Sequence, residues 1–277
     1  MISQDVQPRT GGCPITRLLR GGDAPVPDSR AARIGVLLYG VVAYIAFFGT
    51  ILYAIGFVGN WLVPKSIDSG PPAPLGAALL INSALLMVFV VQHTLMARPW
   101  FKRWWTRFIP DSIERSTFVL AASLSLMLVF WQWRPLPRVV WSVDDGWAAL
   151  ALTAVSLLGW GIVLGSSFMV SHWDLFGLRQ VFLRATGRPY TPIGFKVRGI
   201  YKVVRHPLML GFIIAVWATP TMTVGHLFFA AMITAYIFMG TTIEERDLIA
   251  HFGEQYRAYR RAVPGIFPRP RFRRSNV

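Results

Sequence analysis

The chain has 277 residues, of which 54% are hydrophobic, and a formal net charge of +15 at pH 7. Its mean hydropathy of +0.47 is too high for an ordinary soluble domain. A single cysteine, Cys13, excludes an internal disulfide and a thiolate metal cluster. Residues 1–33 lack the apolar core and cleavage site of a signal peptide, so we expect a disordered basic tail there.

Five apolar segments follow this tail. They run over residues 34–58, 75–97, 116–133, 147–170 and 207–242. A bilayer core of about 30 Å requires about 20 helical residues, so each of the first four segments predicts one crossing. The fifth is too long for one span and is interrupted at Pro220 and Gly225, which predicts a helical hairpin with a short first arm over residues 208–218. The predicted fold is an all-α integral membrane bundle of about five transmembrane segments.

Basic residues are distributed unevenly between the connections. If the segments alternate in direction, 25 of the 28 lysines and arginines lie on one side, and only Lys65, Arg134 and Arg138 lie on the other. This bias is the positive-inside pattern, so we expect both termini in the cytoplasm. A nucleic-acid-binding protein would instead gather its charge on one soluble face, and we expect no nucleic acid partner.

Polar side chains gather at the cytoplasmic ends of the segments. They are Gln92, His93, Glu114, Arg115, His172, Asp174, Arg179, Gln180, Arg205, His206, Glu244, Glu245, Arg246 and Asp247. Ionisable groups at membrane depth are costly, and they usually face a bundle interior or a water-filled cavity. We therefore expect a polar pocket that opens toward the cytoplasm.

Purely structural interpretations of these groups remain open. His93 and His172 are also candidates for structural hydrogen bonds at helix ends, and Glu244 and Glu245 for simple pairing with a nearby arginine. The basic and aromatic stretch 98–107 is most simply an interfacial anchor for anionic headgroups. Dinucleotide and phosphate loops, zinc-protease motifs and the serine-hydrolase motif are absent from the sequence. The residues alone thus leave the reaction open.

Two linked motifs in the C-terminal third resemble the isoprenylcysteine carboxyl methyltransferase superfamily. They are GIYKVVRHPLMLG at residues 199–211 and EERDLIAHFGEQYRAYRRAVP at residues 244–264. Both match the superfamily pattern in order and spacing, except that Met209 replaces an aromatic residue. Further stretches resemble its bacterial methanethiol S-methyltransferase branch, so that the resemblance covers about residues 30–270. These stretches are residues 91–107, 113–120, 130–137, 172–181 and 218–226.

The resemblance implies an enzyme of the bacterial inner membrane that uses S-adenosylmethionine to convert methanethiol to dimethyl sulfide. It implies one membrane domain over residues 34–270, with a cofactor-binding core at 199–264, followed by a basic tail at 271–277. Two alternatives remain: a membrane methyltransferase that acts on a lipid, an isoprenyl thiol or a carboxylate, and a non-catalytic membrane accessory protein. The oligomeric state is open.

Within the superfamily, the His-Pro turn and the first glutamate of the Glu-Glu pair line the cofactor pocket. Arg205 and His206 suit the carboxylate of S-adenosylmethionine, and Glu244 suits its ammonium group or a ribose hydroxyl. The predicted cofactor site is Tyr201, Arg205, His206, Pro207, Leu208, Met209, Gly211, Glu244, Glu245, Tyr256 and Tyr259. Gly211 permits close approach of a ligand or a helix, and the two tyrosines of the last motif either cover the pocket or anchor the interface.

Methyl transfer to a thiol requires a thiolate near the reactive methyl group, because the thiolate is the nucleophile. His93 and His172 are the candidate proton acceptors, and His93 is preferred because it ends a span that can face the pocket. Asp174 is a candidate to orient an imidazole. Arg115 and Arg246 are candidates to stabilise the thiolate, and we expect no metal ion.

Overall fold

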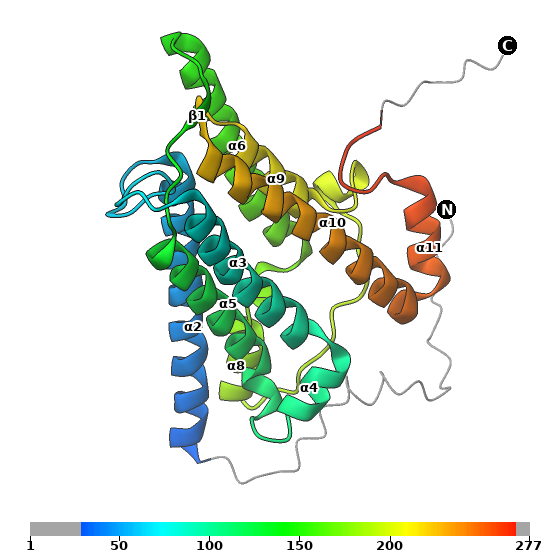
Figure 1. Ribbon diagram of the computed structural model, residues 1–277. Helices are drawn as coiled ribbons and strands as arrows, with labels where there is room; N and C mark the ends of the chain where they lie inside the picture. The colour runs from blue at the N-terminus through cyan, green and yellow to red at the C-terminus, as the bar shows by residue number, and fades with distance from the viewer. Residues whose placement is uncertain (1–28, 270–277) are drawn as a thin grey trace, which may run out of the picture.

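In the computed structural model, which describes residues 29–269, the chain forms a bundle of long apolar helices (Figure 1). Five helices are long and apolar enough to cross a membrane: α2 (Arg30–Gly59), α3 (Leu75–Ala97), α5 (Asp111–Gln132), α6 (Gly146–Val170) and α10 (Val224–Phe252). The predicted all-α membrane bundle is confirmed. Of the two predicted tails, residues 1–28 and 271–277 lie outside the described residues, and residues 30–33 form the first turn of α2.

The fifth predicted segment folds as a hairpin with unequal arms. Helix α9 (Pro207–Trp217) has 11 residues, which is about 16 Å at ~1.5 Å per residue and too short to cross a bilayer. Strand β2 (Thr221–Thr223) joins it to α10 and pairs antiparallel with β1 (Val139–Ser142). Thr223 then caps α10 by accepting a hydrogen bond from the backbone N–H of His226 at 3.1 Å. The hairpin prediction is confirmed.

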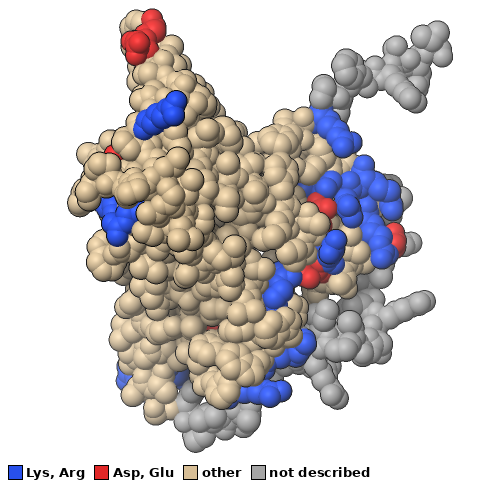
Figure 2. Space-filling model, in the orientation of Figure 1, with Lys and Arg blue, Asp and Glu red and all other residues tan. Residues whose placement is uncertain are grey.

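Short helices occupy the connections on the basic side of the bundle. They are α4 (Pro99–Trp105), α7 (His172–Leu175), α8 (Leu178–Ala185), the 3₁₀ helix η1 (Gly199–Lys202) and α11 (Glu254–Ala262). Figure 1 shows α4, α8 and α11 away from the end of the bundle that carries β1. Figure 2 shows basic side chains gathered around this part of the molecule, beyond a broad uncharged band. Such a division of charge is typical of a protein with two distinct membrane faces.

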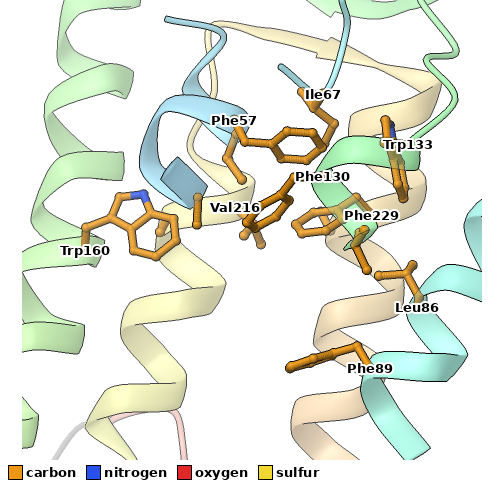
Figure 3. Packing of buried hydrophobic residues seen from close by; sticks show 14 residues of the cluster. Phe57, Ile67, Leu86, Phe89, Phe130, Trp133, Trp160, Val216 and Phe229 are labelled. Atoms are coloured by element: carbon orange, nitrogen blue, oxygen red, sulfur yellow. The ribbon is translucent and has the colours of Figure 1, made fainter. Parts of the chain in front are cut away.

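The main hydrophobic core lies toward the end of the bundle that carries the strands (Figure 3). Phe57 of α2 packs against Phe130 of α5, with ring centroids 4.6 Å apart, and against Phe229 of α10 at 6.0 Å. Trp133 is fully buried and lies edge-on to Phe229 at 5.6 Å. These contacts fix α2, α5 and α10 at one end, and the polar side chains gather at the other end.

Candidate active site

The start of α9 meets the last turns of α10 through a cluster of charged side chains. Arg205 and His206 lie in the turn directly before α9. The Glu245 carboxylate accepts hydrogen bonds from Arg205 Nε at 2.8 Å and Nη2 at 2.6 Å, and its Oε1 lies 3.0 Å from His206 Nε2. Arg260 Nε of α11 lies 3.2 Å from the other carboxylate oxygen. The buried Glu245 therefore joins the turn, α10 and α11.

The Arg205 guanidinium is committed to the protein itself. Its Nε and Nη2 bind Glu245, and its Nη1 donates to the backbone carbonyls of Arg260, at 3.1 Å, and Val263. All three guanidinium nitrogens therefore have protein partners. Arg205 braces the turn that carries His206 and has little capacity left for a ligand carboxylate.

Glu244 differs from its neighbour because its side chain is 50% exposed. Its carboxylate lies 3.6 Å from His206 Nδ1, so most of its hydrogen-bonding capacity is free for a ligand. The first intrahelical hydrogen bond of α9 runs from Leu210 N to the His206 carbonyl at 3.1 Å, which leaves the N–H groups of Leu208 and Met209 without partners inside the helix. A carboxylate, an imidazole and a helix N-terminus thus meet at one turn.

Gly211 faces a neighbouring helix. A Cβ atom on Gly211 would lie 2.7 Å from the carbonyl oxygen of Gly159 and 2.9 Å from a side-chain carbon of Val163, both on α6. A Cβ atom on Gly159 would in turn lie 2.6 Å from the backbone nitrogen of Ala215. Helices α6 and α9 therefore pack with their backbones in close contact, as small residues permit in membranes. Gly211 was expected to permit close approach of either a ligand or a helix. In the structure it lies against the helix α6.

Three tyrosines lie where η1 meets α11: Tyr201 in η1, and Tyr256 and Tyr259 in α11. The Tyr259 hydroxyl donates to the backbone carbonyl of Tyr201 at 2.7 Å. Tyr256 is 2% exposed, and its ring lies 5.8 Å from the rings of Tyr259 and Phe195. Burial raises the pKa of Tyr201 and of Tyr259 to about 12, so both hydroxyls remain protonated donors at neutral pH. Tyr256 and Tyr259 thus dock α11 beside the charged turn.

His93 occupies an aromatic niche near the end of α3. Its ring centroid lies 5.3 Å from that of Phe89, 4.9 Å from that of Phe118 on α5 and 6.2 Å from that of Tyr236 on α10. His93 Nδ1 is buried and has no hydrogen-bond partner among the described residues. The guanidinium carbon of Arg115 lies 5.1 Å from the centroid of Phe118. An imidazole with a free nitrogen therefore shares an aromatic neighbour with an arginine.

One face of α10 connects this niche to the charged turn. Tyr236, Gly240 and Glu244 are spaced by four residues and share that face, over about 12 Å at ~1.5 Å per residue. A Cβ atom on Gly240 would have no heavy atom of the described residues within 4 Å. No described residue therefore fills the space beside Gly240, which lies midway between Tyr236 and Glu244 along α10. Arg246 lies off this face, is exposed, and forms no ion pair or hydrogen bond with residues 29–269.

Asp174 is held by residues of the long connection between α6 and α9. It pairs with Arg179 Nη1 at 2.9 Å and accepts a hydrogen bond from the Tyr190 hydroxyl at 3.2 Å. Burial, with the adjacent carboxylate, raises the pKa of Tyr190 to about 12. Arg115 Nε donates to the backbone carbonyl of Leu175 at 2.7 Å. The structure therefore brings Asp174 near Arg115, with an arginine and a tyrosine as its side-chain partners.

His172 lies apart from the charged turn, between α2 and α6. Its Nε2 is 2.8 Å from the Tyr44 hydroxyl, its Nδ1 is 2.8 Å from the Ser167 hydroxyl, and its ring stacks on Phe168 with centroids 4.0 Å apart. Burial lowers the pKa of His172, so the imidazole is neutral at pH 7. Both ring nitrogens have partners, which is typical of a structural histidine. Within residues 29–269 no three His, Cys, Asp or Glu side chains are grouped to hold a metal ion.

Sequence comparison identifies relatives over most of the chain. The chain is 53% identical over 234 residues to methanethiol S-methyltransferase of Mycobacterium tuberculosis, covering 84% of this chain and 96% of that protein. It is 54% identical over 238 residues to methanethiol S-methyltransferase 2 of Bradyrhizobium diazoefficiens, covering 86% and 92%. It is 48% identical over 244 residues to methanethiol S-methyltransferase of Pseudomonas deceptionensis, covering 87% and 92%. The chain belongs to the methanethiol S-methyltransferase family.

No family model and no solved structure matches the chain. In this member of the methanethiol S-methyltransferase family, sequence reasoning missed Tyr236 and Gly240, although their four-residue spacing from Glu244 was a usable signal. It also missed Tyr190, for which no signal existed, because its partner Asp174 lies 16 residues away across an irregular connection.

Proposed function

We propose that the chain transfers a methyl group from S-adenosylmethionine to the sulfur of methanethiol, giving dimethyl sulfide and S-adenosylhomocysteine. The observation that carries this proposal is the identity of 48–54% to three proteins named methanethiol S-methyltransferase, over 84–87% of this chain. The charged turn before α9 and the niche around His93 supply two adjoining regions, one suited to the donor and one to the acceptor.

The groups at the start of α9 fit S-adenosylmethionine by their chemistry. The half-exposed Glu244 carboxylate suits its ammonium group, and the N–H groups of Leu208 and Met209 suit its carboxylate. The apolar side chains of Leu208 and Met209 suit the adenosine. Arg205 and Glu245 are positioning residues in this scheme, because they hold His206 in place and their own hydrogen-bonding groups already have protein partners. When bound, S-adenosylmethionine supplies an electrophilic methyl group on its sulfonium.

The acceptor region must take a proton from the thiol. A cysteine thiol titrates near ~8.5, and the thiolate is the nucleophile, so a neutral thiol requires a base. We assign this role to His93, because its buried Nδ1 has no other partner in the described chain. Arg115, over the neighbouring Phe118, supplies a positive field that favours the thiolate. We assign His172 a structural role, since both its nitrogens are bonded.

We further propose that the chain lies in a bacterial inner membrane as one domain over residues 34–270, with both termini in the cytoplasm. The 25-to-3 division of basic residues between the two sides supports this orientation. Methanethiol is small and apolar, so it can reach the niche from the bilayer. Cysteine labelling that found position 65 and the C-terminal tail on the same side would contradict the orientation.

The test of the activity uses the purified full-length chain with S-adenosylmethionine that carries a trideuterated methyl group. Methanethiol, a longer alkyl thiol, an isoprenylated cysteine and membrane lipid are offered separately as acceptors, and headspace and lipid fractions are analysed by mass spectrometry. We expect trideuterated dimethyl sulfide that depends on both methanethiol and active protein. Label in the lipid or in the isoprenylated cysteine, with none in dimethyl sulfide, would show that the acceptor has been assigned wrongly.

A further inference from the structure

A groove of about 660 Å³ runs between the end of η1 and the segment that follows α11. Arginine side chains dominate its polar lining: Arg205, Arg260, Arg261 and Arg269. None of His206, Glu244 and the three tyrosines of the donor site lines it. The groove is therefore a feature separate from the open side of Glu244.

The groove has an excess of positive charge. No carboxylate of residues 29–269 lines it. Glu245 lies between Arg205 and Arg260 and offsets one of their two charges. Among the described residues, Arg261 pairs only with the exposed Glu254, at 3.7 Å, and Arg269 makes no ion pair or hydrogen bond. Because Arg205 is committed to the protein, the positive charge open to a ligand lies on Arg260, Arg261 and Arg269. Guanidinium is the group that best matches the geometry of a phosphate.

The walls of the groove are held in place without a ligand. The backbone N–H of Arg205 lies 2.9 Å from the carbonyl oxygens of both Pro264 and Gly265. Ile266, which is 7% exposed, packs in a buried cluster with Ile213 of α9 and Ile237 of α10. The segment after α11 is therefore fixed against the hairpin, and the groove is preorganised.

Exposed apolar side chains lie beside the groove. Phe267 is 52% exposed, and its ring centroid lies 6.3 Å from that of Phe238 on α10. Phe238 and Met239 are themselves exposed on a membrane-spanning helix, and Val203 in the groove lining is 55% exposed. Exposed apolar side chains beside arginines are typical of the membrane interface. Figure 2 shows basic side chains gathered over α11 next to the broad uncharged band.

We propose that this groove binds the phosphate headgroup of one anionic phospholipid of the surrounding leaflet. Free phosphate would meet the same guanidinium groups, but only a lipid would also place its chains along Val203 and Phe267. Lipid binding at this groove is a property separate from methyl transfer. It would hold α11 and the charged turn at the membrane surface. Electrostatic attraction of this kind falls as salt is raised.

The test measures binding of dioctanoyl phosphatidylglycerol to the full-length protein in neutral detergent, with dioctanoyl phosphatidylcholine and inorganic phosphate as comparison probes. We expect saturable binding of one phosphatidylglycerol at this site, with no saturable binding of phosphatidylcholine and no displacement by an equal concentration of phosphate. The double variant Arg261→Gln/Arg269→Gln should weaken phosphatidylglycerol binding by about tenfold or more, because contacts with charged partners are lost. Both positions are exposed, and the melting temperature of the variant checks that it folds.

The matched control is Arg188→Gln/Arg198→Gln, which removes the same charge from exposed positions in the connection between α8 and η1. An equal loss of lipid binding in this control would mean general surface charge and would overturn the proposal. Displacement of the lipid by equimolar phosphate would assign the groove to free phosphate instead. Loss of S-adenosylhomocysteine binding in the Arg261/Arg269 variant would assign it to the donor site.

Discussion

His93 on α3 and Tyr236 on α10 meet edge to face, with ring centroids 6.2 Å apart and planes inclined by 82°. Tyr236 also lies within 3.3 Å of the Thr94 hydroxyl, so the contact joins the two helices at two successive residues of α3. It places the His93 ring at one end of the α10 face whose other end is Glu244. The proposed base and the proposed donor site are thereby connected by one rigid element.

Replacing His93 by alanine tests the assignment of the base. General-base catalysis contributes about 10²–10⁴-fold in rate, so we expect a loss of that order in dimethyl sulfide production with nearly unchanged S-adenosylhomocysteine affinity. Raising the pH should partly restore the rate, because the thiol then ionises without help. The comparison variant His172→Gln should lose far less. Near-parental turnover of His93→Ala from about pH 6 to about pH 9 would leave the field of Arg115 as the better explanation.

Gly240→Val tests whether a reactant occupies the space beside Gly240. The added side chain enters a region where no heavy atom of residues 29–269 lies within 4 Å of the Cβ position, so the fold should be kept while the space is filled. We expect turnover with methanethiol to fall on the order of 10²-fold, the cost of a misplaced reactant. Gly161→Val is the control, because Gly161 also has open space but lies on α6. Equal rates in the two variants would show that no reactant occupies the space beside Gly240.

Gly211→Ala separates the two roles considered for this glycine. Its Cβ atom would lie 2.7 Å from the Gly159 carbonyl oxygen, so α6 and α9 must move apart, at a cost of about 1–3 kcal/mol. Thermal unfolding in detergent should show this loss, whereas the control Gly161→Ala should show none. Reduced S-adenosylhomocysteine affinity at unchanged stability would instead indicate that Gly211 contacts the cofactor.

The spans were predictable because each needs only a local run of apolar residues. Pro220 and Gly225 likewise marked the hairpin, since both act on the local backbone. The boundaries were less accurate: α2 begins at Arg30 and α5 at Asp111, before the predicted positions 34 and 116. In both cases the first turn is polar, because it extends beyond the apolar band. Pairing of β1 with β2 joins segments about 80 residues apart and left no local signal.

The site was predictable as a set of residues but not as a set of partners. The motifs singled out Arg205, His206, Glu244 and Glu245, and the structure brings these four together. The division of roles between the two glutamates depends on Arg205 and Arg260, which both bind Glu245. These two arginines are distant in the sequence, and only the fold brings them together. The same holds for His172, whose partner Tyr44 lies 128 residues away.

Acidification tests the buried His172. Burial lowers its pKa in the folded protein, so the unfolded chain, with a histidine pKa near ~6.5, binds the proton more strongly. Stability is therefore complete above that unfolded value and declines as the pH falls from it toward the lowered folded pKa. We expect the melting temperature of the parent to fall more between about pH 7 and about pH 5 than that of His172→Gln. A His251→Gln variant, at an exposed position, should behave like the parent. Identical pH profiles for all three proteins would refute a buried neutral imidazole.

Equilibrium binding of S-adenosylhomocysteine to Glu244→Gln and His206→Ala addresses the donor site most directly. Calorimetry on the full-length protein should show each variant weakened by about 10- to 150-fold, equivalent to ~1.5–3 kcal/mol for lost hydrogen bonds to charged groups. Glu254→Gln removes the same charge from an exposed position on α11 and should bind like the parent. If Glu244→Gln and His206→Ala both bind with parental affinity, the donor does not occupy the site where the turn before α9 meets the last turns of α10.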